Sequence, residues 1–134
     1  MDQKTMRDRL AGARVGRLAT VGADRRPHIV PCCFTIVHDT LYSAVDGKPK
    51  STRALRRLEN IRVNPSASLL VDHYDDDWER LWWVRVDANG RIVDPGTELE
   101  DAVTRLRAKY EQYQREAPEG PVVALDIVNW RGWP

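Results

Sequence analysis

Most of the sequence divides into short strand-like stretches, and this pattern restricts the chain to a small set of folds. Glycine, proline, aspartate or asparagine stands between these stretches, which are rich in valine, leucine and aromatic residues. Tight connections predict antiparallel pairing, and two main helical stretches interrupt the runs. The predicted strands cover residues 15–21, 28–37, 40–45, 67–72, 81–87, 91–93 and 122–130. We therefore predict an α+β fold in which six or seven antiparallel strands form a small barrel with helices on its outside.

Helical spacing of apolar residues predicts where the chain leaves the sheet. A short helix is expected over residues 4–13, and a basic helix is expected to end near Asn60, before the stop signal Asn64-Pro65. Thr97 and Glu100 have the spacing of a capping box and predict the start of a further helix. The apolar stripe of that helix consists of Leu99, Ala102, Val103, Leu106, Tyr110 and Tyr113.

Three strand signals carry more specific expectations. Asn89-Gly90 is typical of a hairpin turn and predicts a break between the strands on either side of it. The strand over residues 67–72 is almost continuously apolar, which indicates burial on both of its faces. Trp82 and Trp83 are neighbours on one predicted strand and are therefore expected to face opposite sides of the sheet.

Length and composition indicate a single domain spanning residues 1–134. The chain has 42% hydrophobic and 31% charged residues, which is typical of a globular protein and not of a disordered one. No apolar run approaches the roughly 20 residues that span a membrane, and the first ten residues are too charged for a signal peptide. Cys32 and Cys33 are adjacent, so a disulfide between them is not expected, and we expect a cytoplasmic protein.

The ten residues 48–57 (KPKSTRALRR) contain five cations and no acid, and they lie where a strand passes into a helix. Cations at a helix start oppose the positive end of the helix dipole, and a bound anion is the usual compensation. This pattern predicts a phosphate-bearing ligand at Lys48, Lys50, Ser51 and Thr52. The alternative is a solvated basic face, which is the commoner outcome for charge runs in general.

Charge elsewhere weighs against two other kinds of site. The net charge is only +1, and the stretch 72–79 carries five acidic residues, so a nucleic-acid module is disfavoured. The same acidic stretch lacks the ligand spacing and central glycine of a calcium loop, and no Cys or His pair has zinc spacing. We therefore expect no metal site.

Three longer pieces of the sequence carry a family resemblance. They are GRLATVGADRRPHIVPCCF, LYSAVDGKPKSTRALRRLENIRVNPSASLLVDHYDDDW and LWWVRVDANGRIV, and the closing NWRGW follows them. Their order and spacing resemble the flavin- and deazaflavin-binding split β-barrel proteins, the pyridoxamine 5′-phosphate oxidase-like group. The likeness is to the actinobacterial branch that uses the deazaflavin coenzyme F420. This resemblance implies a six- or seven-stranded antiparallel split β-barrel of the FMN-binding type with flanking helices.

The resemblance also implies a homodimer whose cofactor lies in a groove between the subunits. The ring system is expected against the second and third predicted strands, and Trp78, after the acidic loop, is expected to reach the groove. The ring contacts it implies are Pro31, Cys32, Cys33, Ser43, Ala44 and Val45. The phosphate contacts it implies are Lys48, Lys50, Ser51 and Thr52, with added charge from Arg56 or Arg57. Loop length around residues 47–51 varies in the family, which leaves the choice between Lys48 and Lys50 open.

The function implied is hydride transfer between reduced F420 and an electron-poor small-molecule substrate. The tail of F420 ends in several carboxylates, so five cations in one run favour it over FMN. The alternatives are an FMN-binding oxidase or reductase of the same fold, and a carrier that binds F420 or flavin without catalysis. No catalytic acid or base is assigned, because a structural or surface role is the simpler interpretation of His28 and His73.

Overall fold

The computed structural model describes residues 1–45 and 52–134, and of residues 52–55 it describes the backbone only. Its helices are α1 (Gln3–Gly12), α2 (Thr52–Val63), the short 3₁₀ helix η1 (Trp78–Arg80), α3 (Thr97–Lys109) and α4 (Glu111–Arg115). Its strands are β1 (Gly16–Val21), β2 (Pro27–Cys32), β3 (Thr35–Val37), β4 (Thr40–Ala44), β5 (Ser66–His73), β6 (Trp82–Ile92) and β7 (Val122–Trp133). The predicted α+β class is confirmed.

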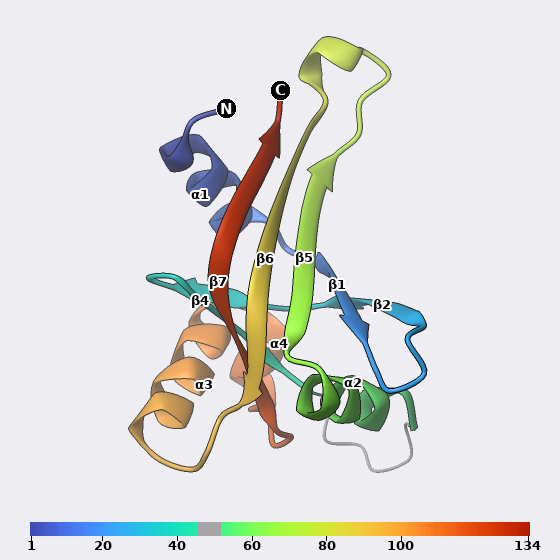
Figure 1. The fold of residues 1–134 in the computed structure, drawn as a ribbon. Coiled ribbons are helices and arrows are strands. Elements are labelled where there is room, and N and C mark those ends of the chain that lie inside the picture. The colour runs from blue at the N-terminus through green and yellow to red at the C-terminus, as the bar shows by residue number, and fades with distance from the viewer. Residues whose placement is uncertain (46–51) are drawn as a thin grey trace.

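The seven described strands form one antiparallel sheet in the order β2-β1-β5-β6-β7-β4-β3. The sheet is curled into a half-barrel, so that the long strands β5, β6 and β7 cross over β1 to β4 (Figure 1). α2 and α3 lie at one end of these long strands (Figure 1). The opposite ends of β5 and β6 extend beyond the body with the loop that joins them, and we call residues 72–82 the arm.

Two apolar clusters hold the sheet and the helices together. The larger cluster fills the inside of the curl and includes Leu10 of α1 and Leu58 and Ile61 of α2. The smaller cluster lies between β4, β7 and α3, where Leu106 is fully buried. Burial of a leucine side chain contributes about 1.5–3 kcal/mol, so these helices are held mainly by their apolar faces.

The predicted strand over residues 28–37 is wrong as a single element. The ladder of β2 ends at Cys32, and β3 begins at Thr35. Between them, the backbone N–H of Phe34 donates a hydrogen bond to the Tyr110 hydroxyl at 3.0 Å, and the Phe34 carbonyl lies 3.1 Å from the same hydroxyl. A side chain 76 positions away therefore takes the place of a strand partner, which no local pattern reveals.

The hairpin predicted at Asn89-Gly90 is also wrong, because β6 continues through both residues to Ile92. Asn89 pairs with Ser66 on one side and with Asp126 on the other. Gly90 serves close packing instead of a turn: a Cβ atom there would lie 3.1 Å from the side chain of Ile61. The glycine lets α2 approach the sheet.

Four further expectations need correction. The N-cap of α3 is Gly96, with φ +146°, and it makes no side-chain cap hydrogen bond, so the capping box of Thr97 and Glu100 does not form. The predicted long helix is divided at Tyr110 into α3 and α4. On β5, burial alternates along the strand, so only one of its faces lies in the core. The basic helix ends at Val63, a few residues later than predicted.

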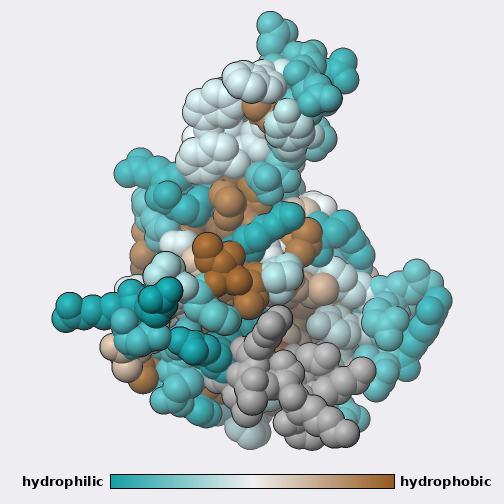
Figure 2. Space-filling model, turned by 90° about the vertical axis from the view of Figure 1, so that its right-hand side faces the viewer, coloured by the Kyte–Doolittle hydropathy of each residue, from teal (hydrophilic) through white to brown (hydrophobic). Residues whose placement is uncertain are grey.

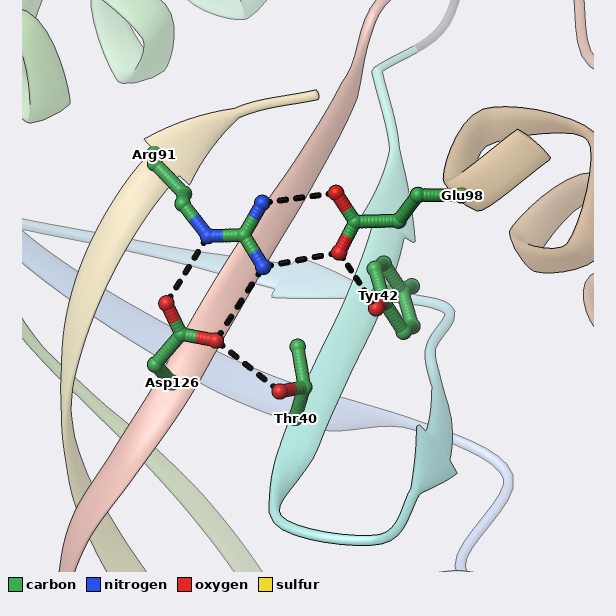
Figure 3. A network of polar contacts seen from close by, with 5 residues as sticks. All are labelled: Thr40, Tyr42, Arg91, Glu98 and Asp126. Carbon is green, nitrogen blue, oxygen red and sulfur yellow. Dashed lines mark hydrogen bonds and ion pairs between the residues drawn. The ribbon is translucent and has the colours of Figure 1, made fainter. Parts of the chain in front are cut away.

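A charged network fastens the start of α3 to three strands (Figure 3). The Arg91 guanidinium donates to both carboxylate oxygens of Glu98, at 2.7 Å each, and to Asp126 at 2.8 and 3.3 Å. The Tyr42 hydroxyl donates to Glu98 at 2.7 Å, and the Thr40 hydroxyl donates to Asp126 at 2.9 Å. Hydrogen bonds from Arg91 and then from Tyr42 lower the pKa of Glu98 to about 2.

We predict that Glu98→Gln removes part of the acid sensitivity of the fold. Because the folded-state pKa of Glu98 is below its ordinary value of 4.5, its contribution is present above that pH and is lost as the pH falls towards 2. Near neutral pH, urea unfolding should give the variant a lower free energy of unfolding than the wild type. This difference should shrink towards about pH 3. Glu111→Gln, which removes an exposed pair with Arg115, is the control and should change little. A margin that stays constant with pH contradicts the prediction.

Candidate functional site

The predicted ring contacts lie on β2, on β4 and on the residues directly after them, and we call this surface the wall. In the single chain, the side chains of these residues differ in their exposure to solvent. Pro31 is exposed and Cys33 is partly exposed, whereas the other four side chains are buried. These four are Cys32, Ser43, Ala44 and Val45.

The burial of these side chains determines what the wall can offer a ligand. Cys32 and Val45 belong to the larger core cluster, and Ala44 belongs to the cluster under α3. The Ser43 hydroxyl donates to the Cys33 carbonyl at 2.7 Å, which holds the two halves of the wall together. A planar group on this surface meets main chain, Pro31 and Cys33, because small buried side chains leave the backbone accessible.

The cationic end of the predicted site lies only partly within the described residues. Lys48, Lys50 and Ser51 lie outside them, as does the side chain of Thr52, the first residue of α2. The predicted phosphate contacts at these four positions therefore stay predictions.

The structure separates the two arginines that follow on α2. Arg56 donates to the Asp24 carboxylate at 2.8 Å, so its charge is already balanced. Arg57 is half-buried, and its Nε atom has no hydrogen-bond partner among the described residues. Burial raises the pKa of the Cys32 thiol, and the hydroxyl of Ser43 and the positive charge of Arg57 oppose that rise, so Arg57 lies close to the wall. A buried guanidinium nitrogen without a partner fits an anion contact.

Trp78 is placed far from the wall of its own chain. It begins η1 at the tip of the arm and is 70% exposed. The tip lies at the opposite end of the molecule from α2 (Figure 1). At the base of the tip a cleft of about 350 Å³ is lined by Asp72, His73, Tyr74, Leu81, Trp82, Trp83 and Trp133. One chain alone does not bring Trp78 to the other predicted site residues.

The outer face of the sheet carries exposed apolar side chains. Ile29 is 65% exposed and Trp133 is 47% exposed. Figure 2 shows apolar side chains in the middle of the face that carries β1 and β2, and the arm above it with a hydrophilic tip. Further along this face the Asp87 carboxylate accepts hydrogen bonds from Ser68 at 2.8 Å and Asn129 at 3.1 Å. Exposed apolar side chains gathered on one face are typical of a surface that another protein covers.

Sequence reasoning missed Lys109, which lies against the segment joining β2 and β3. Its ammonium donates to the Phe34 carbonyl at 2.8 Å and stands 4.0 Å from the centroid of the Phe34 ring. Burial, and then the charge of Arg14, lower the pKa of Lys109 to about 8. Tyr110 was correctly assigned to the apolar stripe, but its bonds to Phe34 were not foreseen. Neither residue carries a local signal, because both contacts join positions 75 or more residues apart.

In the parts of the chain that the structure describes, no three His, Cys, Asp or Glu side chains are grouped as metal ligands. No described helix combines the length and the apolar character that crossing a bilayer requires.

Comparison with known proteins agrees with this architecture. The model of the family described as pyridoxamine 5′-phosphate oxidase matches residues 2–134. The chain belongs to this family. Its split-barrel fold is the one that the sequence resemblance implied. No curated protein matches the sequence.

Solved structures share the fold of this pyridoxamine 5′-phosphate oxidase family member at low sequence identity. The conserved hypothetical protein Rv2991 of Mycobacterium tuberculosis is 20% identical with a TM-score of 0.79, covering 99% of this chain and 84% of that one. An FAD-binding protein of Mycobacterium smegmatis is 19% identical with a TM-score of 0.70, covering 99% and 96%. The heme storage protein HutZ of Vibrio cholerae is 14% identical with a TM-score of 0.75, covering 98% and 92%.

We predict that the two adjacent thiols differ sharply in reactivity. Cys33 is partly exposed, whereas burial both hides Cys32 and raises the pKa of its thiol, which lowers its thiolate fraction. In the folded protein Ellman's reagent should titrate one thiol at least about tenfold faster than the other. Cys33→Ser should remove the fast phase and Cys32→Ser should keep it. A fast phase that survives Cys33→Ser contradicts this placement.

Proposed function

We propose that this protein is an F420-dependent oxidoreductase that transfers a hydride between reduced deazaflavin and an electron-poor small-molecule substrate. The observation that carries the proposal is the unpartnered Nε atom of Arg57, half-buried beside Cys32. A cation whose Nε atom has no partner among the described residues, next to a flat strand surface, suits a planar cofactor with an anionic tail. Membership of the pyridoxamine 5′-phosphate oxidase family supports a cofactor of the flavin type.

In this proposal the chain's own residues bind and orient the coenzyme. The main chain of the wall, with Pro31 and Cys33, lies against the ring system, and Arg57 contacts the anionic tail. Lys48, Lys50, Ser51 and Thr52 take the phosphate, as the sequence predicts. When bound, the coenzyme supplies the hydride chemistry, and the protein supplies position and a site with little water.

F420 is preferred over FMN because the tail of F420 carries more negative charge. Residues 48–57 contain five cations and no acid, and Asp24 neutralises Arg56, one of these cations. The remaining cations exceed what a single phosphate needs, since each desolvated anion calls for its own partner. FMN binding by the same wall is the alternative cofactor.

The site is proposed to need two copies of the chain. Trp78 stands at the tip of the arm, far from its own wall, and the outer face of the sheet exposes Ile29 and Trp133. In a homodimer the arm of one subunit would bring Trp78 to the wall of the other. An isologous pair of this kind creates two equivalent grooves.

A carrier without catalytic activity is the second candidate function. A structural neighbour with the same fold is named as a heme storage protein, so the fold itself does not imply turnover. The lack of an assigned catalytic acid or base among the predicted contacts also fits this candidate. We further propose a cytoplasmic location, which the two free thiols support.

Fluorescence titration with F420 and with FMN tests the cofactor. We expect Arg57→Gln to weaken F420 binding about tenfold or more, because a charge-assisted hydrogen bond contributes about 1.5–3 kcal/mol. Arg56→Gln is the matched control: Asp24 already binds Arg56, so its loss should weaken binding much less. If the protein binds FMN and not F420, FMN replaces F420 as the proposed cofactor. Binding of neither cofactor, or an Arg56 effect equal to that of Arg57, would contradict it.

Complementation between two variants tests the shared site. Trp78→Ala and Arg57→Gln should each weaken F420 binding when measured separately. Unfolding the two variants together and refolding them forms mixed dimers, in which one groove has both native residues. Random pairing should restore about a quarter of the sites to native affinity. Restoration of none would show that Trp78 and Arg57 do not meet across a dimer.

A further inference from the structure

We propose that the Lys109 amine binds an anionic group, a carboxylate or phosphate, on the Cys33–Phe34 segment. This is a second anion contact on the wall, carried by α3 and separate from the basic residues of α2. The inference rests on the proposed function for the identity of the ligand, but not for the existence of the contact.

The position of Lys109 places its charge at the junction of β2 and β3. The ammonium donates to the Phe34 carbonyl at 2.8 Å, with the ring of Phe34 4.0 Å away and the ring of Tyr110 5.3 Å away. Cys33 precedes the contacted residue, and its thiol is close enough to act on the pKa of Lys109. The amine therefore stands beside the partly exposed end of the wall, where a ligand on Cys33 would pass.

No carboxylate of the described chain balances this charge. The ion pairs found within residues 1–45 and 56–134 do not include Lys109, and the charged group acting on it most strongly is Arg14, another cation. Arg14 lies over the ring of Tyr110 with its guanidinium carbon 4.9 Å from the centroid, and it donates to the Lys109 carbonyl at 2.9 Å. Two cations on one aromatic ring, half-desolvated and without an acid, create a local excess of positive charge.

The fold does not need this charge for its own hydrogen bonds. The hydroxyl of Tyr110 already lies within hydrogen-bond distance of the Phe34 carbonyl and accepts from the Phe34 N–H. The end of α3 is closed by the backbone bond from Tyr110 N–H to the Leu106 carbonyl. A neutral side chain at position 109 would avoid the cost of burying an ammonium. A half-buried cation that its own structure does not require is best explained by a ligand that does.

The proposal has a definite pH dependence. The titratable and charged groups facing the amine are Arg14, Cys32, Cys33 and Tyr110, and burial raises the pKa of Tyr110 to about 12 and also raises that of Cys32. These two groups stay neutral near pH 8, where Lys109 itself titrates. An anion favours the charged amine, so its affinity is full below about pH 8 and falls as the pH rises through that value, while binding raises the pKa of the amine.

Nuclear magnetic resonance of ¹³C-labelled lysine side chains tests the proposal on the intact protein. The chain has four lysines, and the Lys109 Cε signal is the one that Lys109→Arg removes. Sulfate is the probe, because it stays a dianion over the whole range, and chloride at equal ionic strength is the control. We expect sulfate to raise the Lys109 pKa by about half a unit or more, and Arg14→Gln to reduce that rise. Lys4, which is exposed and paired with Asp8, should not respond.

Each outcome decides something. The proposal is overturned if chloride raises the Lys109 pKa as much as sulfate does. It is also overturned if the Lys109 pKa stays unchanged at sulfate concentrations that saturate the basic residues 48–57. Titration with F420 then distinguishes two sources of the anion. If F420 raises the Lys109 pKa and sulfate raises it no further, Lys109 binds the tail of the coenzyme. If sulfate still raises the Lys109 pKa in the F420 complex, Lys109 binds an anionic group of the substrate. If F420 fails to bind at all, the proposed function falls, while the sulfate result still decides on the contact.

Discussion

The hydroxyl of Tyr110 joins parts of the chain that are far apart in sequence, and the shape of the wall depends on it. It accepts a hydrogen bond from the Phe34 N–H and lies within hydrogen-bond distance of the carbonyls of Arg14 and Phe34. Burial raises its pKa to about 12, so the group keeps its proton and can donate as well as accept. Without it, the Phe34 N–H would lose its partner, at a cost of about 1–3 kcal/mol, and the Phe34 carbonyl would keep only the Lys109 ammonium. The chain can therefore leave the β2 ladder, turn the Cys33 side outward and enter β3.

How much the sequence foretells depends on whether a signal is local. The first helix and the strands over residues 15–21 and 40–45 follow from apolar spacing between turn residues, and all three are present. Asn89-Gly90 has the local chemistry of a turn, yet Gly90 serves contact with Ile61 across the sheet. Phe34 looks like the middle of a strand until a tyrosine from the other end of the chain is placed against it. Tertiary contacts of this kind override propensity, and a single sequence does not display them.

The same distinction applies to the candidate site. The family resemblance implied the ring contacts of the wall, and the basic run predicted the phosphate contacts, because motif order and residue types are visible in the sequence. The difference between Arg56 and Arg57 was not visible, since it depends on Asp24 in the turn between β1 and β2. Lys109 was missed for the same reason: among the described residues no acid pairs with it, and the lack of a neighbour in space leaves no pattern in the sequence. In the proposed site, the charges expected to contribute most to binding are those that the described part of the chain leaves unbalanced.

The continuity of β6 has a mechanical consequence for the arm. One unbroken strand of eleven residues runs from Ile92, beside the Arg91 network and α2, to Trp82 at the base of the arm. It pairs with β5 on one side and β7 on the other for most of that length. The base of the arm is thus an extension of the central sheet, whereas its tip, residues 74–81, lies beyond the last strand pair of His73 with Trp82. In the proposed dimer the tip would be presented from a base that is already ordered, so that association would sacrifice chain entropy mainly at the tip itself.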